Sequence, residues 1–129
     1  MDDDVAAILE LKTWAVVGCS PDPGRPSHDV ARFLLARGYD VIPVNPNARE
    51  VLGRPCHPSL ADVPRPVEVV DVFRRSEAAG GHVDEAIAAG ARAVWLQLGV
   101  IDEAAVARAR AAGLLAVMNR CPAIELARG

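Results

Sequence analysis

Short apolar runs alternate regularly with amphipathic segments along the chain, and this alternation most constrains the fold. One run, Val69-Val70-Asp71-Val72-Phe73, is almost continuously apolar, as is typical of a parallel strand covered on both faces. The apolar runs lie at residues 15–18, 40–44, 67–73, 93–98 and 114–118, and the helical segments at residues 5–11, 27–37, 77–89, 103–112 and 123–128. With right-handed crossovers, this pattern predicts an α/β fold, a doubly wound parallel sheet of about five strands in the order 3-2-1-4-5.

Individual residues indicate where these elements begin and end. We expect Asp102 to cap the fourth helical segment and Ser27 to cap the second. Pro43 has no N–H to donate to a neighbouring strand, which predicts that the second strand lies near an edge of the sheet or bulges at this residue. Gly80 and Gly81 interrupt the third helical segment and predict a weak start for it.

The composition limits the class of protein. The length of 129 residues predicts a single domain over residues 1–129, and 51% hydrophobic and 24% charged residues are typical of a soluble globular protein. No apolar segment approaches the roughly 18 residues of a membrane span, and the N-terminus is acidic where a signal peptide would be basic. We therefore expect a cytoplasmic protein without a membrane partner, and the net charge of −3 disfavours nucleic acid.

The first apolar run leads into a loop that is typical of a phosphate-binding βα turn. Gly18 ends the run and permits close backbone approach, and the next helix offers free N–H groups at its start. Ser20 is expected to donate to a pyrophosphate oxygen, and Arg25 to pair with a phosphate or lie free in solvent. The spacing of Gly18 and Gly24 matches neither the dinucleotide nor the ATP-hydrolysing glycine motif. The loop therefore predicts a phosphorylated ligand that is bound in neither of those two ways.

The end of the second strand argues against NAD. An NAD site needs an acidic residue there for the ribose hydroxyls, whereas this chain has Asn45-Pro46-Asn47 and then Arg49. A neutral amide beside a cation suits the phosphate-bearing ribose of NADP or coenzyme A. The alternative is that these residues only form a turn, which their types also favour.

In a doubly wound sheet the ligand binds beyond the carboxyl ends of the strands. There, Arg74 or Arg75 is expected to pair with a phosphate, and Gln97 to contact adenine or an amide of the ligand. These ends show no carboxylate pair, Ser–His–Asp set or metal-ligand cluster, which favours binding over catalysis. The candidate binding residues are Gly18, Cys19, Ser20, Pro21, Arg25, Ser27, Val44, Asn45, Pro46, Phe73, Arg74, Arg75, Leu96, Gln97, Gly99, Met118, Asn119 and Cys121.

Cys19 has two interpretations. Beside a helix N-terminus its thiol would have a lowered pKa, whereas in a tight loop it would only be a small apolar residue. The second interpretation predicts that leucine at this position blocks the ligand without disturbing the core, and that alanine does not.

Sequence blocks over nearly the whole chain resemble one family. They are Val17-Gly18-Cys19-Ser20, Arg25-Pro26-Ser27, Gly38-Tyr39-Asp40-Val41-Ile42-Pro43-Val44-Asn45-Pro46, Pro58-Ser59-Leu60-Ala61-Asp62, Asp71-Val72-Phe73-Arg74-Arg75-Ser76, Ala93-Val94-Trp95-Leu96-Gln97-Leu98-Gly99 and Met118-Asn119-Arg120-Cys121. The chain is similar to small coenzyme A-binding proteins related to the N-terminal domain of the succinyl-CoA synthetase α-subunit. The resemblance implies a Rossmann-like domain that binds coenzyme A, but not the synthetase reaction, because the catalytic histidine and the grasp domains have no counterpart.

We therefore predict that the chain binds coenzyme A or an acyl-CoA without catalysis of its own. The ADP part would lie over residues 18–27 and beside the second strand, and the pantetheine would run past residues 96–99 toward residues 118–121. The alternatives are an NADP- or CoA-dependent enzyme, or the ligand-sensing subunit of a larger acyl-CoA enzyme. Association with a second copy or with a partner enzyme stays open.

Overall fold

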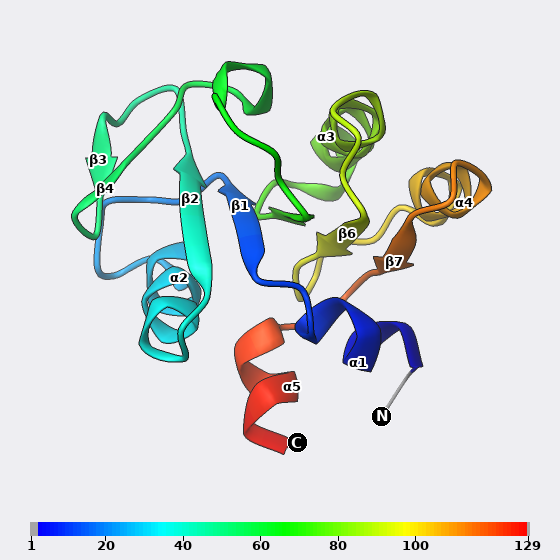
Figure 1. The fold of residues 1–129 in the computed structure, drawn as a ribbon, viewed down its shortest axis with the longest axis horizontal. Coiled ribbons are helices and arrows are strands. Elements are labelled where there is room, and N and C mark those ends of the chain that lie inside the picture. Colours follow the sequence, from blue (N-terminus) through cyan, green and yellow to red (C-terminus); the bar gives the residue numbers. More distant parts are fainter. Residues whose placement is uncertain (1–2, 129) are drawn as a thin grey trace.

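The computed structural model describes residues 3–128. It consists of a parallel five-stranded sheet with helices on both faces (Figure 1). The sheet strands are β1 (Thr13–Val17), β2 (Asp40–Val44), β5 (Val69–Val72), β6 (Ala93–Leu96) and β7 (Leu115–Val117), and β3 (Glu50–Val51) and β4 (Arg54–Pro55) form a separate antiparallel pair. The helices are α1 (Asp3–Leu9), α2 (Pro26–Ala36), α3 (Ser76–Ala88), α4 (Glu103–Ala111) and α5 (Pro122–Arg128), with a 3-10 turn η1 (Leu60–Asp62). The predicted fold class is confirmed; residues 1, 2 and 129 of the predicted domain, and with them the start of the acidic N-terminus, lie outside the described residues.

The strand order differs from the predicted one. The sheet runs β2-β1-β5-β6-β7, so that β5, the third of the five long strands, pairs with β1 and not with β2. The segment that follows β2 already occupies the free edge of that strand. His57 forms a bridge to Val44 and donates its N–H to the carbonyl of Pro43, and Arg54 Nε donates to the carbonyl of Val41 at 3.1 Å. As Pro43 predicts, β2 is therefore an edge strand, and the next strand pairs on the other side of β1.

Alternate residues of each strand enter two separate cores. Trp14 and Val16 of β1 pack in the cluster formed with α1, α2 and α5, whereas Ala15 and Val17 pack in the cluster formed with α3 and α4. Figure 1 shows these two helix groups on opposite sides of the sheet. Because both faces are covered, the strands need apolar residues at every position, which explains their continuous apolar runs. Within residues 3–128, no helix is long and apolar enough to cross a membrane.

The helix starts agree only in part with the sequence. Asp102 caps α4, and its carboxylate accepts a hydrogen bond from the Ala105 N–H at 3.0 Å. The prediction that Ser27 caps α2 is wrong, because Pro26 already stands in the first turn, where it has no N–H to be capped, and Arg25 is the capping residue. Gly80 lies inside a continuous α3, where its missing Cβ leaves room for Asp102 of the packed neighbouring helix, 3.0 Å from the place a Cβ would take.

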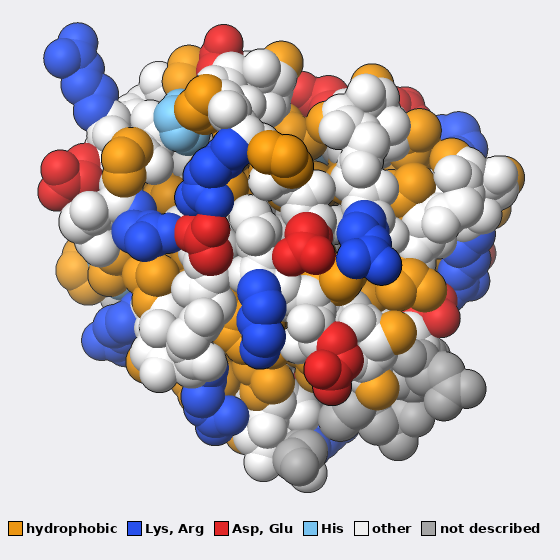
Figure 2. Space-filling model, in the orientation of Figure 1, with side chains coloured by type: hydrophobic (Ala, Val, Ile, Leu, Met, Phe, Trp, Pro, Cys, Tyr) orange, Lys and Arg blue, Asp and Glu red, His pale blue; other side chains and the backbone are white. Residues whose placement is uncertain are grey.

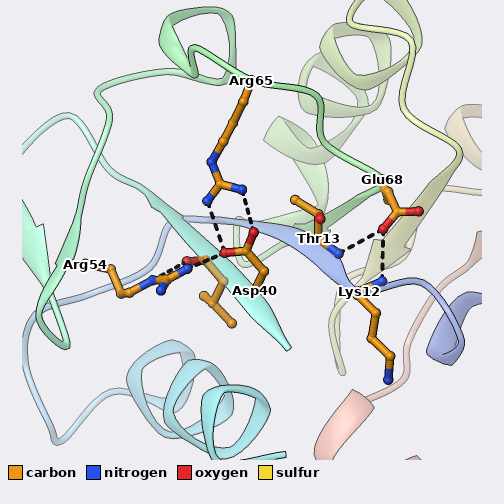
Figure 3. A network of polar contacts seen from close by, with 7 residues as sticks. Lys12, Thr13, Asp40, Arg54, Arg65 and Glu68 are labelled. Atoms are coloured by element: carbon orange, nitrogen blue, oxygen red, sulfur yellow. Dashed lines mark hydrogen bonds and ion pairs between the residues drawn. The ribbon is translucent and has the colours of Figure 1, made fainter. Parts of the chain in front are cut away.

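Two carboxylates stabilise the amino ends of β2 and β1 (Figure 3). Asp40, at the start of β2, is paired with Arg54 and with Arg65, and these arginines hold the pKa of its carboxyl below the usual value. Glu68 accepts hydrogen bonds from the backbone N–H groups of Lys12 and Thr13 at 3.0 and 3.1 Å, which lowers the pKa of its carboxyl. The β3–β4 pair, through Arg54, and the chain before β5, through Arg65, are thereby connected to the start of the edge strand β2.

Candidate binding cleft

A cleft of about 720 Å³ lies beyond the carboxyl ends of β1, β5 and β6, where the sequence predicted a ligand site. The structure brings most of the candidate residues together around it. Those that line the cleft are Gly18, Ser20, Arg25, Ser27, Asn45, Phe73, Arg74, Arg75, Gln97, Gly99 and Cys121.

The loop between β1 and α2 is ordered by its own side chains. Ser27 Oγ accepts a hydrogen bond from the Ser20 N–H, and Ser20 Oγ accepts one from the Asp22 N–H, both at 3.0 Å. His28 Nδ1 lies 3.0 Å from the carbonyl oxygen of Ser20. Ser20 thus makes the hydrogen bonds of a structural loop residue, while its hydroxyl proton remains available for donation into the cleft.

Gly18 brings the loops after β1 and β5 into contact. Its φ of +84° lies in the left-handed region, and a Cβ built on it would lie 2.4 Å from the carbonyl oxygen of Phe73. The same position is 3.4 Å from Arg74 Nε. The glycine is required by the approach of a neighbouring backbone, and this approach positions Arg74 over the β1 loop.

Three arginines of the cleft have no acidic partner. Arg25, Arg74 and Arg75 line it, and within residues 3–128 none of the three forms an ion pair. No Asp, Glu or His belongs to the described lining, so the positive charges are not balanced there. Arg49 was also expected at this rim, but it does not line the cleft. Unpaired guanidinium groups at a hollow surface are suited to phosphates or carboxylates.

The end of the cleft over β6 and β7 is less charged. Gln97 is buried there, and its Oε1 accepts no hydrogen bond from the described part of the chain. Gly99 is held by Asn119, whose Oδ1 accepts a hydrogen bond from the Gly99 N–H at 2.8 Å. An unsatisfied buried amide oxygen is unusual and points to a donor that the protein itself does not supply.

Several lining residues were not predicted from the sequence: Pro26, Val30, Leu98, Val100 and Ile124. Leu98 and Val100 directly flank the predicted Gly99, so the whole loop after β6 could have been included. Val30 and Ile124 lie one helical turn or less from predicted loops, and the position of their helices over the sheet was needed to place them.

Other candidates do not line the cleft: Cys19, Pro21, Val44, Pro46, Leu96, Met118 and Asn119. The side chains of Val44 and Leu96 are buried in the core next to α3 and α4. Pro21 and Pro46 are exposed. Asn45 both forms the turn that its type favours and lines the cleft, because its Oδ1 accepts from the Asn47 N–H and its Nδ2 donates to the Cys19 carbonyl at 3.0 Å.

Both predictions about Cys19 need correction. Its side chain is fully buried in the core cluster that contains Trp14 and Val16, and this burial raises the pKa of the thiol to about 12. The thiol is therefore not activated by the nearby helix. A leucine at this position would overfill the core, so it would not leave the fold undisturbed.

Comparisons with known proteins identify relatives for most of the chain. A family model described as a CoA binding domain matches residues 12–127. YneT of Bacillus subtilis (strain 168) is 38% identical over 119 residues, which cover 92% of this chain and 88% of that protein. The structure of a hypothetical protein from Pyrococcus horikoshii OT3 is 44% identical, with a TM-score of 0.93 over 99% of this chain and 91% of that one.

The fold also occurs inside a much longer protein. The dinucleotide-forming acetyl-coenzyme A synthetase 1 of Ca. Korarchaeum cryptofilum, in complex with phosphate and ADP, is 31% identical with a TM-score of 0.73. The match covers 82% of this chain but only 25% of the synthetase. The chain thus corresponds to about a quarter of that protein.

Proposed function

The chain belongs to the CoA binding domain family, and we propose that its cleft holds coenzyme A or an acyl-CoA through a phosphate-binding βα loop, without catalysis of its own. The observation that carries the proposal is the group of unpaired arginines, Arg25, Arg74 and Arg75, beside the loop after β1. Coenzyme A has a pyrophosphate and a 3′-phosphate at one end, and each phosphate is a strong partner for a guanidinium group.

The uneven distribution of charge along the cleft supports one orientation of the ligand. The ADP part lies over residues 18–27 and beside Asn45 at the end of β2, where the arginines gather. The pantetheine runs past Gln97 and Gly99 toward Cys121.

The lining of the cleft supports binding without catalysis. A general acid or base at neutral pH is most often a histidine or a carboxylate, and the described lining contains neither. An NADP-dependent enzyme is the main competitor, because Asn45 with a nearby arginine also suits a phosphorylated ribose. The test therefore compares the two cofactors directly.

Thermal unfolding with coenzyme A, NADP, NAD and ATP tests the proposal. A ligand at about 100 times its Kd adds roughly 2.7 kcal/mol to the free energy of unfolding, which raises Tm by several degrees for a domain of this size. Coenzyme A is expected to give the largest shift. A shift with NADP or NAD that equals or exceeds it would overturn the assignment, and mass spectrometry of any ligand released on denaturation provides an independent check.

A further inference from the structure

The large hydrophobic side chains that remain exposed lie in the loop after β6 and in α5, and two of the three line the cleft. Among the described residues they are Leu98, Ile101 and Ile124, which are 58%, 49% and 43% exposed. Leu98 and Ile124 line the cleft together with Val100, on the side of β6 and β7. Exposed apolar side chains that gather at a hollow surface indicate an apolar ligand or partner.

The two arginines nearest to Ile124 in the sequence are already paired. Arg120, on the loop after β7, lies 3.6 Å from Glu125, and Arg128 lies 3.5 Å from the same carboxylate. Glu125 is buried and directly follows Ile124 in α5. A negatively charged group placed against Ile124 would therefore meet a carboxylate and two arginines that are already engaged.

The apolar end continues beyond the cleft. A groove of about 520 Å³ between α2 and α5 is lined by Val30, Phe33, Ala36 and Ala123, with Asp29 and Arg32 at its rim. Val30 lines both the groove and the cleft, and Ala123 precedes Ile124. A chain of methylene groups that leaves the cleft at Ile124 thus has further apolar surface to cover.

We propose that the physiological ligand is a thioester of coenzyme A with an uncharged, apolar acyl chain, which packs against Leu98, Val100 and Ile124. This inference rests on the proposed function, since it assumes that the phosphates occupy the arginine end. It excludes acyl groups that end in a carboxylate.

Calorimetry with coenzyme A and three thioesters tests this inference. Each buried methylene adds about fourfold in affinity, so butanoyl-CoA, which has two more methylene groups, is expected to bind about fifteenfold tighter than acetyl-CoA. Succinyl-CoA also has a four-carbon acyl group, but a carboxylate replaces the terminal methyl, and it is expected to bind at least about tenfold more weakly than butanoyl-CoA. Equal affinities of butanoyl-CoA and succinyl-CoA would overturn the inference.

Variants at the apolar end locate the acyl chain. Leu98→Ser and Ile124→Ser are expected to bring the ratio of butanoyl-CoA to coenzyme A affinity close to one. Ile101→Ser is the matched control, because Ile101 is similarly exposed but does not line the cleft, and it should keep the wild-type ratio. If the ratio persists in Leu98→Ser and Ile124→Ser, the proposed position is wrong. If coenzyme A binds but butanoylation adds nothing, only this inference fails, whereas the proposed function fails if neither binds.

Discussion

The arginines at the β2 edge and the arginines in the cleft differ in their partners. Arg54 and Arg65 share one carboxylate, that of Asp40, at the start of β2. Arg25 and Arg74 both line the cleft, which has no acidic side chain in its described lining. The two groups consist of the same residue type, but only the second leaves its charge available.

The difference teaches how to separate structural from ligand-binding arginines in a chain where this residue is common. On the face shown in Figure 2, basic and acidic side chains are interspersed, as in a surface whose charges balance locally. A set of cations that the protein does not balance raises the local positive potential and attracts an anionic ligand. The useful criterion is therefore the absence of an ion pair at a position that lines the cleft, and not exposure.

Replacement of Arg74 by alanine should have the largest effect. A charge-assisted hydrogen bond contributes roughly 1.5–3 kcal/mol, so the affinity for coenzyme A should fall about tenfold to hundredfold. Arg74 is half-buried and held beside Gly18, and it therefore loses little side-chain freedom on binding. Calorimetry measures the change.

Arg49→Ala is the matched control for this measurement. Arg49 is also an exposed arginine without an ion pair among the described residues, but it does not line the cleft. Its removal should leave the affinity within about twofold. If both variants lose affinity equally, the arginines act only through the overall charge, and the contrast between the two regions has no bearing on binding.

Removal of one phosphate from the ligand should have a somewhat smaller effect. Dephospho-CoA lacks the 3′-phosphate, and its affinity is expected to be about tenfold lower than that of coenzyme A, because one charge-assisted contact is lost. The decrease should itself diminish in Arg25→Ala or Arg75→Ala, according to which arginine contacts this phosphate. Equal affinities of the two ligands would mean that no cleft arginine contacts the 3′-phosphate.

The sequence was sufficient to predict the fold class and the position of the cleft. Continuous apolar runs such as that at Val70 indicate strands covered on both faces, and the carboxyl ends of such strands meet at one edge. The strand order was not predictable in the same way. It depends on contacts that the later segment makes with the free edge of β2. The backbone N–H of His57 and the side chain of Arg54 both donate to carbonyl groups of that strand.

Prediction of the site residues from the sequence is limited in the same way. Gly18 and Arg74 follow strands, and their position beyond the sheet follows from the fold. Whether a loop residue faces the cleft or the core depends on local backbone geometry, and for this reason Cys19 was placed in the crevice although its side chain is buried beside Trp14. Whether an arginine lines the cleft is a tertiary property, so Arg49 could not be separated from Arg25 by sequence.

Asp71 can be compared with Asp40, because it is a carboxyl group of the core that has no arginine partner among the described residues. Asp71 of β5 is completely buried, and neither of its oxygens has a hydrogen-bond partner among the described residues, so burial raises the pKa of its carboxyl well above the ordinary value of 3.8. The folded state therefore binds this proton more tightly than the unfolded state, and stability falls as the pH rises above about 3.8 until the folded pKa is passed.

Asp71→Asn removes this titration. Chemical denaturation at several pH values should show that the variant gains stability relative to the wild type as the pH rises from 4 to 8, with no gain at pH 3. The affinity for coenzyme A should not change, because Asp71 does not line the cleft. A pH-independent difference would mean that Asp71 is not protonated in the fold.

The smallest effect is expected at Asp40, where two arginines are paired in solvent. Its carboxylate is more than a third exposed, and exposed ion pairs contribute about 0.2–1 kcal/mol each, so Asp40→Asn should lower the free energy of unfolding by about 1 kcal/mol at pH 7. The pKa of Asp40 is lowered in the fold, and its contribution is therefore present above the ordinary value of 3.8 and is lost as the pH falls through the folded value. The difference in stability between the wild type and the variant should disappear below that pH and diminish at high salt, and this pH dependence is the reverse of that expected at Asp71.

Arg65→Ala should lower stability in the same way as Asp40→Asn and leave coenzyme A binding unchanged. A loss of coenzyme A affinity in Arg65→Ala equal to that in Arg74→Ala would show that the paired arginines also serve the ligand, and that pairing does not separate the two roles.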